Sequence, residues 1–323
     1  MANVTASMVK DLRDKTGAGM LDCKNALAET NGDLQAAVDW LRKKGVLKAA
    51  KKADRVASQG LIGVTVHGDT GALVEVNAET DFVARNDQFK EFVTKVANVA
   101  RQVGGDIEKL HDTSLEKGGA KVKDIVPEMV AKIGENISVR RTVALSVTPG
   151  VVAAYVHNAA DGSKELGKIG VLVGLRSTAG DKEKLAALGK QIAMHIAAAA
   201  PLALTADHLS PDVVERESEV QRELARQSGK PENVIEKMIE GRMRKFYEES
   251  VLLNQVFVID GETPVGKVIE KAARELGAPI EIAGYYRFAV GEGIEKIESD
   301  FADEVSRMSG KKPRGEDGDD AKV

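Results

Sequence analysis

The sequence has 323 residues, with 46 Lys and Arg against 50 Asp and Glu, and therefore a formal net charge of −4. This length suggests about two domains, and the weakly acidic balance disfavours wholesale binding of nucleic acid. The only cysteine, Cys23, excludes an intramolecular disulfide and indicates a reducing compartment. The five histidines show no ligand spacing, and no segment has the ~18 apolar residues of a bilayer span. We therefore expect a cytoplasmic protein without a metal or a membrane segment.

The N-terminal 55 residues are predicted to form a small helical module followed by a basic linker. Apolar side chains recur at helical spacing in three short segments of 5–43, which Gly17–Gly19 and Asn31–Gly32 separate. The basic run at 42–55 has two interpretations, a solvated helical linker or an arm that binds RNA. We favour the linker, because the run has no aromatic side chain on which a base could stack. No direct contact with nucleic acid is therefore expected.

The middle of the sequence contains an internal near-repeat of a hairpin, an amphipathic helix and a further strand. Apolar residues alternate in the hairpin strands and follow helical spacing in the helices. The repeat predicts two related α+β subdomains, each an antiparallel sheet with helix cover. The segments are 61–67, 72–78, 87–102 and 138–147 in the first copy, and 151–157, 169–175, 181–200 and 281–290 in the second.

A charged segment interrupts the second copy. Two helices, from Pro211 to about Gln227 and from Glu232 to about Glu249, flank a turn at 228–231. Their apolar stripe is narrow and surrounded by charges of both signs, which is typical of a protruding antiparallel helical hairpin. The stripe consists of Val213, Val220, Leu224, Val234, Met238 and Met243.

Two features are similar to enzyme motifs but lack the necessary chemistry. Residues 261–268, GETPVGKV, approach the phosphate-loop pattern, and the apolar run 256–260 before them is predicted to be a strand. However, Val268 lacks the hydroxyl that would bind magnesium, and Pro264 lacks an amide that would face a phosphate. Cys23 has no histidine in its module to activate a thiolate. A nucleotide-binding enzyme is therefore the weaker alternative, and no catalytic residue or cofactor is expected.

The segment 77–87, NAETDFVARND, contains one of the few aromatic residues, which make up 4% of the chain. It joins a predicted strand to a predicted helix, so Asp81 and Phe82 are expected on a loop. A Phe next to an acid on such a loop suits a wedge that enters a pocket of another protein. The alternative is a hydrophobic staple, in which Phe82 or Val83 packs against the helix that follows. The residues alone favour the staple.

Six longer motifs extend along the chain in one order. They are LRDKTGAGMLDCKNAL (12–27), VNAETDFVARND (76–87), KIGENISVRR (132–141), AMHIAAAAP (193–201), QSGKPENVIEKMIEGRM (227–243) and VGEGIEKIESDFADEV (290–305). Together they resemble the bacterial elongation factor Ts family over essentially the whole chain. The resemblance implies a translation factor, not an enzyme, that promotes GDP release from elongation factor Tu by disturbing its magnesium and nucleotide site. GTP can then reload.

The resemblance also implies which residues meet the partner. Thr80, Asp81, Phe82 and Val83 match the intruding segment of the family. On this basis Phe82 inserts between two helices of the GTPase domain, and Asp81 helps to disturb the neighbouring magnesium site. The staple and the wedge thus remain as two hypotheses for Phe82, with the family motif favouring the wedge.

A second set of residues is implied in the same way. Arg13, Met20 and Leu21 match an N-terminal surface that docks on the same GTPase domain, and His157 matches a core residue near the partner. Residues Gly291 to Val305 match a C-terminal module that also touches the partner. A homodimer or a 2:2 complex through the helical hairpin is a further expectation.

The elements and the resemblance together predict an α+β fold in several parts. These are an N-terminal three-helix module similar to ubiquitin-associated domains, two related core subdomains of antiparallel sheet and helix, an inserted antiparallel helical hairpin and a C-terminal helical module. The predicted divisions are 1–55, 56–148, 149–205 with 255–289, 206–254 for the hairpin, 290–310 for the C-terminal module and 311–323 for a disordered tail.

Overall fold

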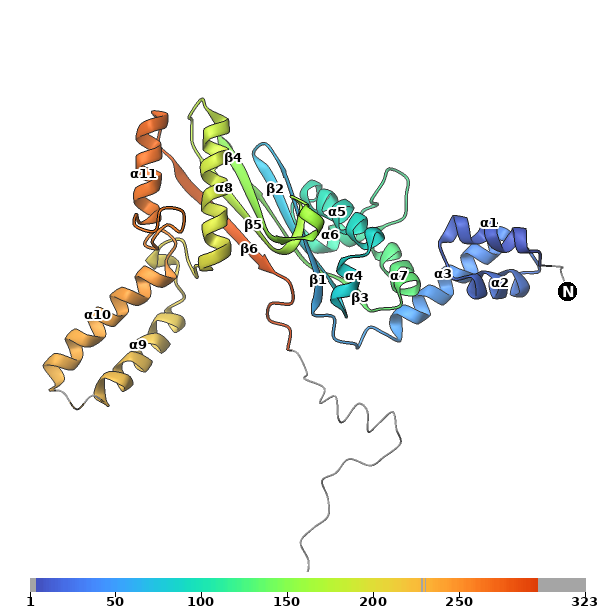
Figure 1. Ribbon diagram of the computed structural model, residues 1–323, viewed down its shortest axis with the longest axis horizontal. Coiled ribbons are helices and arrows are strands. Elements are labelled where there is room, and N and C mark those ends of the chain that lie inside the picture. The colour runs from blue at the N-terminus through green and yellow to red at the C-terminus, as the bar shows by residue number, and fades with distance from the viewer. Residues whose placement is uncertain (1–3, 228, 230, 296–323) are drawn as a thin grey trace, which may run out of the picture. The chain divides into compact units, whose positions relative to one another are not determined.

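The computed structural model shows a mixed α+β protein, with helices at the N-terminal end and antiparallel strands covered by helices (Figure 1). It describes residues 4–227, 229 and 231–295. The chain divides into two units, 1–292 and 293–323. All helices and strands with described bounds belong to the first unit. The predicted fold class is confirmed at this level.

Part of the sequence prediction lies outside the described residues. This applies to the C-terminal module predicted at 290–310 from residue 296 onward, and to the whole tail predicted at 311–323. Among the helices that the structure describes, none is long and apolar enough to cross a membrane.

Three helices form the N-terminal part, as the sequence predicts. Thr5 accepts a hydrogen bond from the Met8 N–H at the start of α1, and Asp33 caps α3 in the same manner. Gly17 ends α1 with a φ of 64°, a conformation that favours glycine. The helices are α1 (Ala6–Thr16), α2 (Met20–Glu29) and α3 (Leu34–Ala50). They enclose a small core of Val9, Leu12, Cys23, Ala26, Leu27 and Ala37.

Helix α3 is longer than expected, because it continues through the basic segment to Ala50. Two of its lysines, Lys44 and Lys48, form ion pairs with Asp22 of α2 at 3.1 and 2.9 Å. Further along, α3 packs against α7 (Val122–Ile133). The basic segment 42–55 is therefore helical as far as Ala50 and forms turns and a bend over 51–55, and part of its charge is neutralised within the protein.

Six strands, all paired antiparallel, form two triplets in the order β3-β2-β1 and β4-β5-β6. Each triplet contains a predicted hairpin and its predicted third strand. The structure differs in joining them: β1 pairs with β5 through Ile62–Gly167 and Gly63–Leu166, so one six-stranded sheet results. The strands are β1 (Gln59–His67), β2 (Thr70–Ala78), β3 (Ile137–Ser146), β4 (Gly150–Ala159), β5 (Leu166–Arg176) and β6 (Glu281–Ala289).

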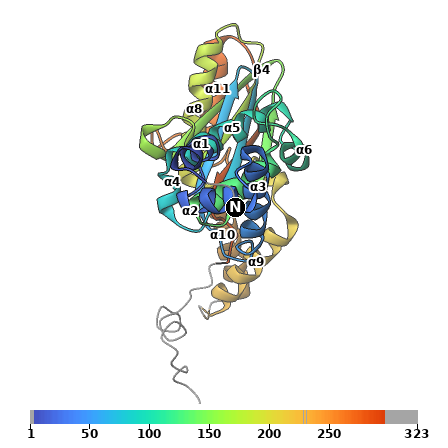
Figure 2. The ribbon, with the colours of Figure 1, turned by 90° about the vertical axis from the view of Figure 1, so that its right-hand side faces the viewer.

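Each triplet has its own helix cover. Phe89, Phe92 and Val96 of α5 pack on the β1–β3 side, and α8 and α11 lie side by side over the β4–β6 side (Figures 1 and 2). The predicted helices at 87–102 and 181–200 are confirmed to within a residue or two. The helices are α4 (Asp81–Ala84), α5 (Asp87–Gln102), α6 (Ile107–Asp112), α7 (Val122–Ile133), α8 (Lys182–Ala199) and α11 (Val265–Leu276), with 3-10 turns η1 (Ala160–Gly162) and η2 (Ala206–His208).

The inner faces of the two triplets pack on each other. Val74 of β2 lies in the α5 cluster, whereas its neighbour Leu73 joins Ile62 and Leu172 in a cluster drawn from both triplets. This follows from the alternation of side chains along a strand. Gly170 and Gly174 of β5 allow the close approach, since a Cβ at Gly170 would lie 2.6 Å from Ile62 Cγ2.

The charged segment forms the predicted helix pair, α9 (Pro211–Arg226) and α10 (Glu232–Ser250), which pack on each other (Figure 1). The predicted apolar stripe is partly wrong. Val220 and Leu224 are 46% and 47% exposed, while Ala225 and Ile235 are buried. The seam between the helices therefore lies about one position away from the predicted stripe on α9.

The predicted strand at 256–260 is also wrong. Only Val256 forms an isolated bridge, and Val258 to Asp260 form a turn. Phe257 is buried beside His195, with ring centroids 5.8 Å apart. Lys267 of α11 is ion-paired with Glu270 at 2.9 Å. The strand, loop and free lysine of a phosphate loop are therefore not assembled here.

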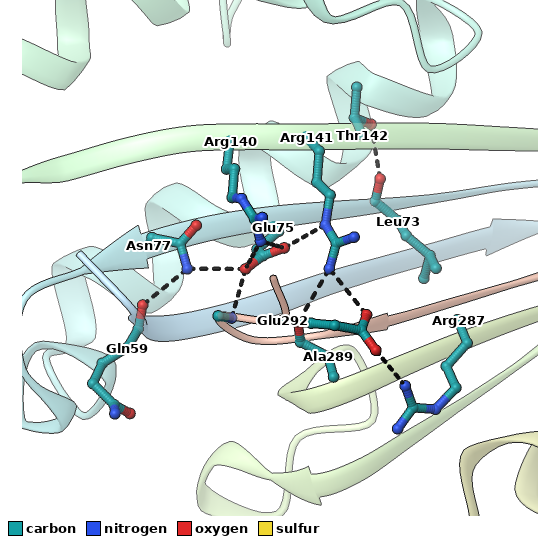
Figure 3. A network of polar contacts seen from close by, with 11 residues as sticks. Gln59, Leu73, Glu75, Asn77, Arg140, Arg141, Thr142, Arg287, Ala289 and Glu292 are labelled. Atoms are coloured by element: carbon teal, nitrogen blue, oxygen red, sulfur yellow. Dashed lines mark hydrogen bonds and ion pairs between the residues drawn. The ribbon is translucent and has the colours of Figure 1, made fainter. Parts of the chain in front are cut away.

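A carboxylate on β2, the central strand of the β1–β3 triplet, is buried (Figure 3). Glu75 of β2 is 0% exposed and accepts hydrogen bonds from Arg140 at 3.1 and 3.2 Å and from Arg141 Nε at 2.5 Å. Asn77 Nδ2 and the Gly291 N–H donate to the same carboxylate at 3.0 and 2.7 Å. Both oxygens are therefore satisfied, as a buried charge requires.

Candidate partner-docking surface

The segment after β2 forms one turn of helix, α4, where the sequence predicted a loop. Val83 and Ala84 point inward and are 5% and 4% exposed, within the cluster under α5. Phe82 points outward and is 81% exposed. The two hypotheses thus apply to different residues: Val83 packs inward as a staple would, whereas Phe82 does not pack against the protein.

Thr80, at the start of the turn, is held by an acidic residue that lies far along the chain. Its backbone N–H and its hydroxyl donate to the two carboxylate oxygens of Glu135, at 2.9 and 2.6 Å. Glu135 lies between α7 and β3, 55 residues further along the chain. Charged acceptors make the stronger kind of hydrogen bond, so the start of the turn is firmly held.

Asp81 is paired rather than free. Lys168 Nζ of β5 donates to its carboxylate and also to the Gly60 carbonyl, the latter at 3.1 Å. Arg85 lies 3.5 Å from the second oxygen. The hydrogen bond from Lys168 lowers the pKa of Asp81 below its usual value, with Arg85 adding in the same direction. The carboxylate therefore stays ionised at neutral pH.

The N-terminal candidates lie on the first two helices. Met20 and Leu21, in the first turn of α2, are 63% and 69% exposed, and Arg13 is exposed on α1. Within the described residues, no hydrogen bond or ion pair connects this group to the turn that carries Phe82. These two adjacent apolar side chains are therefore available to a partner.

His157 stands apart from both groups. It is exposed near the end of β4, opposite Ile169 of β5, and its Nδ1 lies 3.2 Å from the Tyr155 hydroxyl. The segment that follows it is held to α5 by Lys90 and Asp161, 2.5 Å apart. The structure brings no other predicted site residue to His157.

Two residues that hold the turn, Glu135 and Lys168, were not identified from the sequence. Glu135 lies within the KIGENISVRR motif, directly after the glycine that ends α7. An acid after such a stop is a weak signal. Lys168 looks like an ordinary charged residue near the start of a strand, so no local pattern marks it.

Chemistry of other kinds finds no support in the described residues. No group of three or more His, Cys, Asp or Glu side chains converges there as a metal site requires. Burial raises the pKa of the Cys23 thiol, which is the wrong direction for a nucleophile.

Comparison with known proteins adds to this geometry. The family model described as Elongation factor TS matches residues 79–292. Elongation factor Ts of Rhodospirillum centenum is 56% identical over 96% of this chain and 100% of its own length. The corresponding proteins of Parvibaculum lavamentivorans and Rhizobium etli are 58% and 55% identical, each over 95% of this chain and 98% of their own length.

The chain belongs to the elongation factor Ts family. The resemblance drawn from the six motifs is thereby confirmed. The function predicted with it, nucleotide exchange on elongation factor Tu, follows, and the chain is not an enzyme. Membership of the elongation factor Ts family names the partner but does not assign the contact residues.

Proposed function

We propose that the α4 turn inserts Phe82 into an apolar crevice of the GTPase domain of elongation factor Tu. The proposal rests on one observation: Phe82 is 81% exposed although the residues on either side of it in the turn are held in place. Val83 is buried, Thr80 is bonded to Glu135, and Asp81 is paired with Lys168. Because the backbone of the turn is already held, docking of Phe82 costs little backbone conformational entropy.

The other predicted residues complete the proposed contact. Arg13, Met20 and Leu21 dock on the same GTPase domain, where two exposed apolar side chains supply area and Arg13 a charge. Asp81 competes for the groups that surround the magnesium ion, and His157 contacts the partner from the core. These assignments are supported by the exposure of Met20, Leu21 and His157.

Exchange needs no catalytic group in this proposal. A factor that binds the nucleotide-free GTPase better than the loaded form weakens nucleotide binding by the same factor, because the two binding equilibria are linked. Burial of one Phe side chain contributes about 1.5–3 kcal/mol, and each ~1.4 kcal/mol is a factor of ten. When this burial occurs only in the nucleotide-free complex, Phe82 alone supplies at most about 10- to 150-fold of the acceleration.

The test is the rate of GDP release from elongation factor Tu, followed with a fluorescent GDP analogue over a range of factor concentrations. Phe82→Ala is expected to lower the maximal rate about 10- to 150-fold. The matched control is Leu202→Ala, which shortens another apolar side chain that is 62% exposed. The control should leave the rate unchanged. An unchanged maximal rate with Phe82→Ala would remove Phe82 from the mechanism.

We also propose the finer division of the fold. The parts are 1–55 for docking, 56–148 and 149–205 with 255–289 as related core halves, 206–254 as the inserted hairpin, and 290–310 as a C-terminal module. The matching strand orders of the two triplets support the relation between the core halves. Limited proteolysis tests the outer boundaries: first cuts near 206, 254 and 290 are expected, and first cuts within the strands would contradict them.

The hairpin is proposed to pair two chains, alone or in a 2:2 complex with elongation factor Tu. Its support is that Val220 and Leu224, one turn apart on α9, are about half exposed. Sedimentation equilibrium with and without the partner tests this. We expect a dimer, and we expect the double variant Val220→Ser with Leu224→Ser to abolish it. A factor that is strictly monomeric and forms a 1:1 complex would exclude pairing through the hairpin.

A further inference from the structure

We propose that Glu135 is a positioning residue for exchange, because its carboxylate fixes the direction in which Phe82 leaves the α4 turn. This inference rests on the proposed role of Phe82. The carboxylate of Glu135 is engaged within the protein: it accepts two hydrogen bonds from Thr80, the residue that immediately precedes the turn.

The geometry of the turn shows why one carboxylate has this effect. Thr80 is the N-cap residue of α4, but its side chain makes no capping bond within that turn. Its hydroxyl and its N–H instead donate to the two oxygens of Glu135, at 2.6 and 2.9 Å. Two parallel bonds to one planar group fix an orientation as well as a distance. The path of the chain into α4 is thus set by Glu135.

The far end of the turn is fixed independently. Val83 and Ala84 are buried under α5, which sets the depth of the turn. Phe82 lies between these buried residues and Thr80, which is hydrogen-bonded to Glu135. With both ends held, the Phe82 side chain can only project outward, and loss of either support frees its direction while its apolar surface remains.

Asn136, the residue after Glu135, forms hydrogen bonds with a second segment of the chain. The Asn136 N–H donates to Glu79 Oε1 at 2.6 Å, and its side-chain amide donates to the carbonyls of Arg55 and Ala53 at 2.8 and 3.3 Å. These carbonyls belong to the segment that leaves α3. The Glu135–Asn136 pair therefore holds the Phe82 turn and the connection from the N-terminal helices in one place.

A positioning role makes a specific kinetic prediction. Glu135→Ala should lower the maximal rate of GDP release from elongation factor Tu on the order of tenfold, because a displaced contact loses much of its effect. The factor concentration for half-maximal rate should change much less, since the N-terminal docking residues are untouched. Glu135→Gln, which keeps an acceptor oxygen, should restore part of the rate.

The decisive measurement is a double-mutant cycle with Phe82→Ala. If Glu135 acts through Phe82, then Glu135→Ala will cause little further loss in the Phe82→Ala background. An equal loss in both backgrounds would mean general damage to the fold and would overturn the inference. Glu116→Ala serves as the control, because it removes a surface carboxylate that is paired with Lys95 at 2.8 Å.

A second measurement uses the free protein. Glu135→Ala should speed amide hydrogen exchange in a peptide covering 79–85 and leave the rest of β2 and α5 protected. Unchanged exchange there would also overturn the inference. The two proposals can be refuted separately. If Phe82→Ala lowers the rate of GDP release but Glu135→Ala does not, only the role of Glu135 is refuted. If Phe82→Ala leaves the rate unchanged, the proposed role of Phe82 is refuted as well.

Discussion

Removal of the buried carboxylate of Glu75 tests the polar core of the sheet. Glu75 is 0% exposed and is the shared acceptor for Arg140 and Arg141 (Figure 3). It also accepts hydrogen bonds from Asn77 and from the Gly291 N–H, beyond the end of β6. Glu75→Ala would remove the carboxylate partner of Arg140, and would leave Arg141 with only the Ala289 carbonyl and the Glu292 carboxylate as acceptors.

The expected loss follows from this burial. Breaking a buried ion pair by removing one partner costs about 3–5 kcal/mol, because the remaining charge is desolvated and unpaired. The two arginine side chains are 29% and 31% exposed, so water relieves part of this, and the lower end, about 3 kcal/mol, is expected. Glu292→Ala is the control: its carboxylate pairs with Arg141 and Arg287 but is 48% exposed. Its removal should cost less than about 1 kcal/mol.

The assay is urea unfolding of the full chain, followed by far-ultraviolet circular dichroism, with the free energy of unfolding from linear extrapolation. Glu75→Gln, which keeps the shape and loses the charge, should fall between the wild type and Glu75→Ala. If Glu75→Ala were within about 1 kcal/mol of the wild type, or no worse than Glu292→Ala, the reasoning from burial would be refuted.

Two further predictions concern titrating groups. Burial lowers the pKa of His195, whose Nε2 faces Gln255 Oε1 at 2.9 Å while its Nδ1 accepts from the Val258 N–H at 3.3 Å. As the pH falls below about 6.5, the unfolded chain binds a proton that the folded protein resists. The free energy of unfolding should therefore fall by up to about 1.4 kcal/mol per pH unit, and a His195→Gln variant with the same slope would contradict this. Separately, Lys168→Met should raise the pKa of Asp81 towards its ordinary value, because it removes the main hydrogen bond. A carbon-13 titration of the Asp81 carboxyl checks this, and an unmoved midpoint would speak against Lys168 as the cause.

The helices and hairpins could be predicted because their patterns are local. Alternation over a few residues marks a strand, and recurrence every three or four marks a helix. The run at 256–260 shows where this fails: it is apolar and short, and periodicity alone does not distinguish a strand from a buried turn. The conformation of this run depends on the packing of Phe257 against His195, which lies 62 positions earlier in the chain.

The supports of the site could not be predicted for a related reason. In the strand that contains Glu75, a charged residue between apolar ones indicates a solvent-facing position. The side chain is buried because distant segments meet at it, Arg140 and Arg141 of β3 and the Gly291 N–H beyond the end of β6. Likewise, the motif singled out Phe82, whereas Glu135 and Lys168, which hold its turn, come from distant segments.

The glycines between the two triplets have a consequence for how this sequence can vary. A Cβ at Gly174 would lie 2.5 Å from Val147 Cγ2, and one at Gly170 would lie 2.6 Å from Ile62 Cγ2. Replacement of either glycine by a larger residue therefore requires that the facing residue be replaced by a smaller one at the same time. The smallest residues of the interior are thus among its least replaceable, and we expect their tolerated substitutions to be coupled in pairs across the two triplets.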